Sequence, residues 1–391
     1  MAIKNEYIKR PLLSPSFDIN ENPYYINLYT GILGYVDTKK RVTRPLFFLG
    51  MNERGYSQYI DTFRYNNKFY CLQGLSEKRP HIRVLDEIGG SRDIVLNDYP
   101  IADKMKKEAY FSSWIRIENY AFGLGYAYPA VVRLNLETEE VSYISESIAE
   151  IGAELKFSDG LGYFSSVQSF YKDGILYMPL SCINGVLKLD CNTLEEKIEF
   201  YDVDSVGFSC IVGMDDDRCL LTGAGKNPNW LYICDIRNQI VEASIRLQDA
   251  PNALSVKNML VAGETVYLFP WTNWNEYNLD IWTFDTNTHE VNNTFLLGSH
   301  YCCEKKKWLF GYEIVYAGVK DENTFLYVTG KDLLWHEFNV KNGEYIEYAV
   351  VLDDKDEESE KITKEYYRSL SNNRLPIKEA ELGLNDYLDI V

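Results

Sequence analysis

The chain has 391 residues, of which 46% are hydrophobic and 25% charged, and its formal net charge at pH 7 is −18. Such a negative field repels phosphate backbones and anionic membrane surfaces, so we expect neither nucleic acid nor membrane as a partner. The first residues lack the apolar core of a secretion signal, and no apolar stretch is long enough to cross a bilayer. We therefore expect an acidic cytoplasmic protein.

Similar sequence units recur about every fifty residues, and each ends in a turn that carries Asp or Asn. The turn residues are Asp37, Asp86, Asn135, Asp190, Asp235, Asp285 and Asn339. Asp and Asn side chains accept hydrogen bonds from the backbone two residues further on, which stabilises a tight turn. The repeat predicts several copies of one small structural unit.

A second mark opens most units, where an aromatic or apolar residue precedes Ser. The pairs are Tyr56-Ser57, Phe111-Ser112, Phe164-Ser165, Phe208-Ser209 and Leu254-Ser255. The hydroxyls either form a ring that binds an anion or water, or satisfy backbone groups where a strand begins. We favour the second interpretation, because folding needs a feature in every repeat and a single binding site does not.

In chain order, the first unit spans residues 24–49, with a turn at Asp37 and a strand over 41–48. Its first strand is not evident from the pattern: either segment 7–13 supplies it, or a strand from the other end of the chain completes the sheet. The clearest unit is the fourth, where alternating apolar residues and Gly-containing turns predict four strands. We expect these strands at 165–171, 175–180, 186–190 and 197–201.

Each unit therefore reads as a four-stranded antiparallel sheet, which cannot bury both of its faces alone. Sheets packed radially around an axis solve this problem. We predict an all-β fold, a β-propeller with seven blades over residues 1–352. The alternative is six blades plus an extra hairpin.

At this level of pattern, residues 20–352 resemble the kelch-like and related β-propellers, whose repeats have a similar length. The glycine pair and Trp of kelch repeats are missing, as are the Gly-His and Trp-Asp pairs of WD40 repeats. The resemblance therefore implies a fold and carries over no functional residue.

Residues 353–391 break the repeat and form an acidic tail in which apolar residues at four-residue steps predict short helices. Isolated helices this short are marginal in water, so they need a surface. They either cover part of the propeller or dock to another protein.

Cysteines and histidines give no sign of a metal site or a cofactor. The eight cysteines show no CxxC spacing, and we expect buried reduced thiols. His81, His289, His300 and His336 are too far apart for metal-ligand spacing. No nucleotide-binding or nucleophile motif is present.

Propellers bind ligands at the end formed by the connections between second and third strands and by the links between blades. Two such connections, GAGKNPNW and PWTNWNEYN, are rich in aromatic and polar groups that suit sugar rings or peptide side chains. Two links between blades open at the same end. The candidate ligand-binding residues are Lys226, Trp230, Trp271, Trp274, Glu276, Tyr277, Arg54 and Trp114. The alternative is that the tryptophans cover the core of the next blade.

The sequence favours a non-enzymatic recognition scaffold that binds a protein, peptide or glycan through these loops. The alternative is a carbohydrate- or peptide-processing enzyme with carboxylates at the mouth of the channel. An enzyme needs an acid and a base that converge at a pocket, whereas a scaffold needs only a broad face.

Overall fold

Among the residues that it describes, the computed structural model contains 28 β-strands and one α-helix. It describes residues 24–27, 31–50, 57–74, 79–87, 90–101, 110–152, 162–164, 168–225, 227–247, 255–271, 280–296, 314–321, 324–329, 335–339, 341–342 and 344–350. The acidic tail, residues 353–391, lies outside this part of the chain. Among the described residues, no helix has the length and apolar character needed to cross a membrane.

The first sheet combines strands from both ends of the described chain. Its order is β1 (Tyr24–Asn27), β2 (Ile32–Asp37), β3 (Val42–Phe48) and β28 (Ala349–Val350). β28 pairs with β3 in parallel, with Ala349 opposite Val42, whereas the other pairs are antiparallel. A strand from the other end of the chain thus completes this sheet as its fourth strand, whereas the first strand is β1, at the start of the predicted unit. Segment 7–13 lies outside the described residues.

Six further sheets follow in chain order, each with four strands. The second contains β4 (Tyr59–Tyr65), β5 (Lys68–Gln73), β6 (His81–Asp86) and β7 (Ser91–Val95); the third contains β8 (Phe111–Ile117), β9 (Tyr120–Gly125), β10 (Val131–Asn135) and β11 (Val141–Ile144), followed by helix α1 (Glu146–Gly152); the fourth contains β12 (Phe170–Lys172), β13 (Ile175–Pro179), β14 (Gly185–Asp190) and β15 (Glu196–Phe200).

The last three sheets repeat this order. The fifth contains β16 (Gly207–Gly213), β17 (Arg218–Ala224), β18 (Trp230–Asp235) and β19 (Ile240–Arg246); the sixth contains β20 (Ser255–Ala262), β21 (Thr265–Trp271), β22 (Asp280–Asp285) and β23 (Val291–Leu296); the seventh contains β24 (Ile314–Asp321), β25 (Thr324–Thr329), β26 (Trp335–Asn339) and β27 (Tyr345–Glu347). Seven four-stranded sheets are the blades of a β-propeller, which confirms the predicted fold. The six-bladed alternative is wrong.

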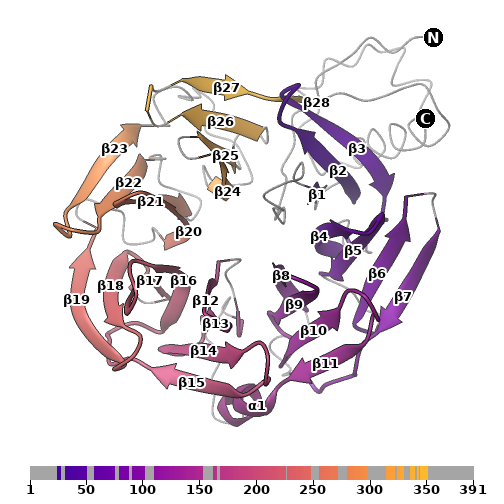
Figure 1. Ribbon diagram of the computed structural model, residues 1–391, viewed down its shortest axis with the longest axis horizontal. Helices are drawn as coiled ribbons and strands as arrows, with labels where there is room; N and C mark the ends of the chain where they lie inside the picture. The colour runs from indigo at the N-terminus through magenta and orange to yellow at the C-terminus, as the bar shows by residue number, and fades with distance from the viewer. Residues whose placement is uncertain are drawn as a thin grey trace. The chain divides into compact units, whose positions relative to one another are not determined.

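The chain divides into two compact units. The first unit contains β1–β7 and β26–β28, and the second contains β8–β25 with α1. Within the second unit, Figure 1 shows the sheets one after another. The first strand of each sheet, β8, β12, β16 or β20, lies on the side of its sheet that faces the middle of the picture. There β16 contacts both β12 and β20.

Apolar side chains of consecutive sheets in the second unit share a core. Phe122 and Val131 of the third sheet cluster with Leu176, Leu187 and Leu189 of the fourth, and all five are buried. Equivalent clusters join the fourth sheet to the fifth and the fifth to the sixth. Each sheet therefore buries a face that it could not bury alone.

The predicted turn chemistry is present in the six turns whose residues two and three positions on are described. In each, the Asp or Asn side chain accepts hydrogen bonds from the backbone N–H groups two and three residues further on. The six residues are Asp37, Asn135, Asp190, Asp235, Asp285 and Asn339. In five of these turns the residue four positions on has a left-handed φ: Arg41, Glu139, Leu194, Gln239 and His289.

The repeated Ser satisfies backbone groups near a bulge in the first strand of a sheet. Strands β8 and β16 shift register around Ser112 and Ser209. Ser112 Oγ donates to the Leu124 carbonyl at 3.3 Å, and Ser209 Oγ donates to that of Gly223 at 3.2 Å. For Ser57, which accepts the Tyr59 N–H at 3.1 Å, the role is similar. The structural interpretation is confirmed at these three positions.

Candidate functional site

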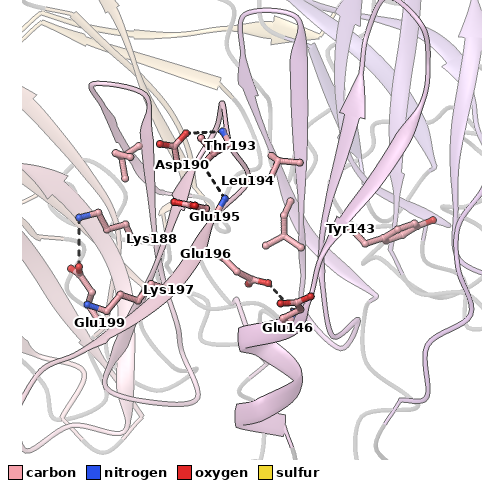
Figure 2. A pocket seen from close by; sticks show the side chains of 12 residues that line it. Tyr143, Glu146, Lys188, Asp190, Thr193, Leu194, Glu195, Glu196, Lys197 and Glu199 are labelled. Carbon is pink, nitrogen blue, oxygen red and sulfur yellow. Dashed lines mark hydrogen bonds and ion pairs between the residues drawn. The ribbon is translucent and has the colours of Figure 1, made fainter.

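A pocket of about 760 Å³ lies in the second unit along the outer part of the fourth sheet, and β11 and the start of α1 also line it. Figure 2 shows its lining side chains, which come from β11 and the start of α1 on one side and from β13–β15 with the β14–β15 turn on the other. We call it the acidic pocket, because five carboxylates and two ammonium groups line it. The carboxylates are Glu146, Asp190, Glu195, Glu196 and Glu199, and the ammonium groups are Lys188 and Lys197.

Part of the wall of the acidic pocket is apolar. Ile144 is buried, and Ile175, Leu194 and Tyr143 are half-buried. Leu194 lines the pocket from the β14–β15 turn, where its backbone φ is +65°. The Tyr143 hydroxyl accepts the backbone N–H of Asn97 at 2.9 Å, which fixes the ring at the rim. The pocket therefore combines an apolar surface with charged groups.

Glu196 joins the two sides of the acidic pocket. Its Oε1 accepts the backbone N–H of Glu146 at 2.8 Å, so the carboxylate binds the first residue of α1 (Figure 2). Partial burial raises the pKa of Glu196, and the charge of Glu146 raises it further, against hydrogen bonds from Glu146 and Ser147. Glu196 therefore holds its proton more strongly than an exposed glutamate does.

Asp190 ends β14, where the β14–β15 turn of the pocket begins, and its pKa is shifted in the opposite direction to that of Glu196. Its Oδ1 accepts the N–H groups of Asn192 at 2.8 Å and Thr193 at 3.0 Å. These hydrogen bonds lower the pKa of the Asp190 carboxyl. The turn thus keeps a full negative charge at the edge of the pocket at neutral pH.

Glu199 is the most deeply buried carboxylate of the acidic pocket, with a side chain that is 4% exposed. Its Oε1 lies 3.6 Å from Lys188 Nζ and accepts a 3.4 Å hydrogen bond from Gln239 Nε2. Its Oε2 is buried and accepts no hydrogen bond from the described residues. Glu199 shares one face of the fourth sheet with Val186 and Lys188, the face that packs against the fifth sheet, whereas Glu196 lies on the opposite face.

The arrangement suits an ammonium or guanidinium group better than a metal ion. Among the described residues, no three His, Cys, Asp or Glu side chains come together in a way that could hold a metal ion. The two lysines offset only part of the negative charge that the carboxylates bring. Unpaired carboxylate oxygens accept hydrogen bonds from ammonium and guanidinium donors.

The structure describes only some of the residues predicted to bind a ligand. Trp114 lies on β8 and is buried, and Trp230 begins β18, half-buried against an apolar cluster of the fourth and fifth sheets. Trp271 ends β21, and its side chain lies outside the described part. The same is true of five whole residues: Lys226, Trp274, Glu276, Tyr277 and Arg54. Their role stays a prediction.

Two connections between second and third strands in the second unit pack closely against other backbone. The β9–β10 connection donates two N–H groups, from Tyr126 and Tyr128, to the Tyr110 carbonyl at 2.8 and 3.1 Å. At the β13–β14 connection, Leu180 accepts the Phe208 N–H at 2.8 Å, and Ser181 Oγ donates to the Phe208 carbonyl at 3.3 Å. These hydrogen bonds hold neighbouring segments of the chain together.

His81 belongs to a buried hydrogen-bond network at one end of the second sheet. Its Nδ1 donates to the Arg79 carbonyl at 2.9 Å, so the Tyr59 hydroxyl donates to its Nε2 at 3.0 Å. Asp93 lies near it and forms a bidentate ion pair with Arg83, at 2.5 and 3.0 Å. Both ring nitrogens of His81 are thus engaged, and burial raises the pKa of Tyr59. The network supports the sheet.

Sequence reasoning missed the acidic pocket, since its walls are fifty residues apart. Glu146 and Glu196 occupy similar places in consecutive repeats, one after β11 and the other at the start of β15. The available signal was a density of acidic residues around the outer turns of these two units. Helix α1 was not predicted, and it is the element that brings Glu146 to the pocket.

No protein family model matches the chain, and no curated protein matches it in sequence. Solved structures are similar to it in fold. Virginiamycin B lyase from Staphylococcus aureus, solved with quinupristin, is 9% identical, with a TM-score of 0.57 over 84% of this chain and 96% of that one. YCF48 bound to D1 peptide is 9% identical, with a TM-score of 0.54 over 88% and 96%. YCF48 from Cyanidioschyzon merolae is 11% identical, with a TM-score of 0.55 over 87% and 98%. At these identities the likeness shows a shared fold and no shared activity.

Proposed function

We propose that this β-propeller is a non-enzymatic recognition scaffold that binds a protein or peptide in the cytoplasm. The observation that carries the proposal is the acidic pocket, an open, charged recess at the outer strands of two consecutive sheets. Its groups suit the recognition of a polar partner. A propeller of similar fold, YCF48, was solved with a bound peptide, which supports the choice of ligand class.

The pocket differs from an acid-base site in how its carboxylates are used. Glu196 binds a backbone N–H, Asp190 caps a turn, and Glu199 faces Lys188. Three of the five carboxylates therefore have structural partners. A glycan at the loop that includes Trp271 and Tyr277 remains a separate prediction, since the placement of that loop is not described.

The test begins with the full chain as bait in extract from its own cells, with captured molecules identified by mass spectrometry. Each candidate is then purified and titrated by calorimetry. We expect a saturable isotherm with one protein or peptide, which is recovered chemically unchanged. Recovery of a cleaved or modified partner would favour the enzyme alternative. Binding confined to purified glycans would overturn the ligand class.

A further inference from the structure

We propose that Cys219 and Cys234 are a site of reversible oxidation, at which hydrogen peroxide converts two neighbouring thiols into a disulfide within the fifth sheet. Both residues are free thiols in this structure. In the cytoplasm, disulfides that form and break again are typical of proteins that respond to oxidants.

The two cysteines lie directly opposite each other on neighbouring antiparallel strands. Cys219 is on β17 and Cys234 on β18, and the register pairs one with the other. Residues in such a pair point to the same face of the sheet. Among the described cysteines, no other two are paired in this way.

The two thiols also contact each other. A hydrogen bond between them is the main cause that raises the pKa of the Cys219 thiol, and burial raises it further. Both side chains face the fourth sheet, where they pack in one apolar cluster with Tyr177 and Tyr201. The sulfur atoms are therefore neighbours before any oxidation.

The position of the pair in the sheet makes its disulfide easy to reduce. The Ile236 N–H donates to the Asp217 carbonyl at 2.8 Å, and because hydrogen-bonded pairs alternate along antiparallel strands, Cys219 and Cys234 form the next one. The Cβ atoms of opposite residues lie about 4.5–5.5 Å apart, whereas a disulfide needs about 3.5–4.5 Å. The strands must shift to close the bond, and strained disulfides are the labile ones.

The reaction is a two-electron oxidation of the pair. One thiolate attacks hydrogen peroxide and breaks its O–O bond, which gives a sulfenic acid, and the departing hydroxide takes up the proton that the thiol lost. The second sulfur then attacks the sulfenic sulfur, and the departing hydroxide takes up the second thiol proton. One S–S bond has formed, and the peroxide has been reduced to two water molecules.

Burial sets the threshold of this reaction. Both cysteines lack exposed surface, so the pair stays reduced until the two strands open transiently. Once one sulfur is oxidised, the other is the nearest thiol and closes the disulfide. The predicted ligand-binding residues Lys226 and Trp230 lie between the two cysteines in the chain, so the bond tethers the segment that carries them.

The probe is hydrogen peroxide added to the full folded chain, followed by alkylation of the remaining thiols, digestion without reduction and mass spectrometry. We expect one cross-linked peptide that joins Cys219 to Cys234 and is lost after treatment with dithiothreitol. Cys71 is the internal comparison, because it is equally buried and lies opposite no cysteine, so it should stay a thiol. The absence of this cross-link, or a bond from either cysteine to a different one, would overturn the proposal.

A variant tests the role of the second thiol. In Cys234→Ser, no neighbouring thiol traps the sulfenic acid, so prolonged peroxide treatment should carry Cys219 to a sulfinic acid that dithiothreitol does not reduce. Cys71→Ser is the matched control and should form the same disulfide as the wild type. A Cys219 that dithiothreitol still returns as a thiol in Cys234→Ser would contradict the assignment. If that variant does not fold, the cross-linked peptide of the wild type decides the proposal by itself.

Discussion

Gln168 holds the main chain of Met259 with both ends of its side-chain amide. Oε1 accepts the Met259 N–H at 2.5 Å, and Nε2 donates to the Met259 carbonyl oxygen. The two residues are 91 positions apart. Gln168 precedes β12 of the fourth sheet and Met259 lies on β20 of the sixth, so one side chain connects sheets that are not consecutive in the chain.

Replacement of Gln168 by alanine removes both hydrogen bonds and leaves partly buried main-chain groups without partners. We expect the free energy of unfolding to fall by about 1–3 kcal/mol, measured by urea denaturation. Gln168→Glu keeps an acceptor for the Met259 N–H but loses the donor to the Met259 carbonyl. It therefore removes only one of the two hydrogen bonds. Wild-type stability of the alanine variant would show that the contact contributes nothing.

Asp235 tests the repeated turn through pH. Its Oδ1 accepts the N–H groups of Arg237 and Asn238, each at 2.8 Å, and the hydrogen bonds of Asn238 are the main cause of its lowered pKa. A carboxyl with a lowered pKa stabilises the fold above its unfolded pKa of about 3.9 and loses this contribution as the pH falls through its folded pKa. Asp235→Ala should lower the melting temperature at pH 7, with a smaller difference from wild type near pH 3.

In the same experiment Asp235→Asn is the control, because the amide oxygen still accepts both N–H groups. It should lose less stability than the alanine variant at pH 7. An alanine variant whose deficit is the same at pH 3 and pH 7 would contradict the role of the charge.

Glu196 predicts the opposite pH dependence. Burial raises its pKa, so its ionised form is disfavoured in the folded protein, and its contribution to stability is lost as the pH rises through the folded pKa. Glu196→Gln keeps an oxygen that accepts the Glu146 N–H. We expect it to melt at a higher temperature than the wild type at pH 7, a gain that disappears below about pH 4. A Glu196→Gln variant that melts at the wild-type temperature at pH 7 would contradict this prediction.

Gly125 is confined by backbone. A Cβ at this position would lie 1.9 Å from the Tyr128 carbonyl oxygen and 2.7 Å from that of Ala130. Gly125→Ala should therefore cost about 1–3 kcal/mol or more, measured by denaturation. Gly263 is the comparison, because its φ is +62° and a Cβ there meets nothing within 4 Å. Gly263→Ala should cost only about 1 kcal/mol, from backbone strain, and a larger loss there than at Gly125 would contradict the packing.

Tyr59→Phe removes the donor to His81 Nε2 and leaves a buried acceptor unsatisfied. We expect a loss of about 1–3 kcal/mol in the free energy of unfolding. Tyr171→Phe makes the same chemical change at a residue that is 43% exposed, so it should change stability little. Equal effects at the two positions would show that the network around His81 is not stabilising.

The repeat could be read from the sequence because its chemistry is local. Asp190 and Asp235 cap turns with N–H groups two and three residues away, so a pattern of single residues marks each unit. The strands of the fourth sheet follow the predicted alternation, although β12 is shorter than the predicted 165–171. β1 pairs with β2, its neighbour in the chain, whereas the pairing of β28 with β3 depends on a contact between distant segments.

The site was less predictable, because it depends on which outer elements face each other. The sequence predicted Trp114 and Trp230 as ligand-binding residues, because they lie in or beside loops rich in aromatic residues. In the structure Trp114 is buried, and Trp230 packs against an apolar cluster. The acidic pocket instead depends on a hydrogen bond from the Glu146 backbone N–H to Glu196. No pattern of residues in the sequence predicts this contact. A buried oxygen such as Glu199 Oε2 is visible only when the surrounding atoms are placed.

The most direct test of the account is the affinity of a purified captured partner for the wild-type chain and for the double variant Glu146→Gln with Glu195→Gln. We expect saturable binding to the wild type, at least tenfold weaker binding to the double variant, and full affinity in Glu150→Gln, which changes an exposed glutamate of helix α1 that does not line the pocket. A partner that binds all three chains equally would contradict recognition through the acidic pocket.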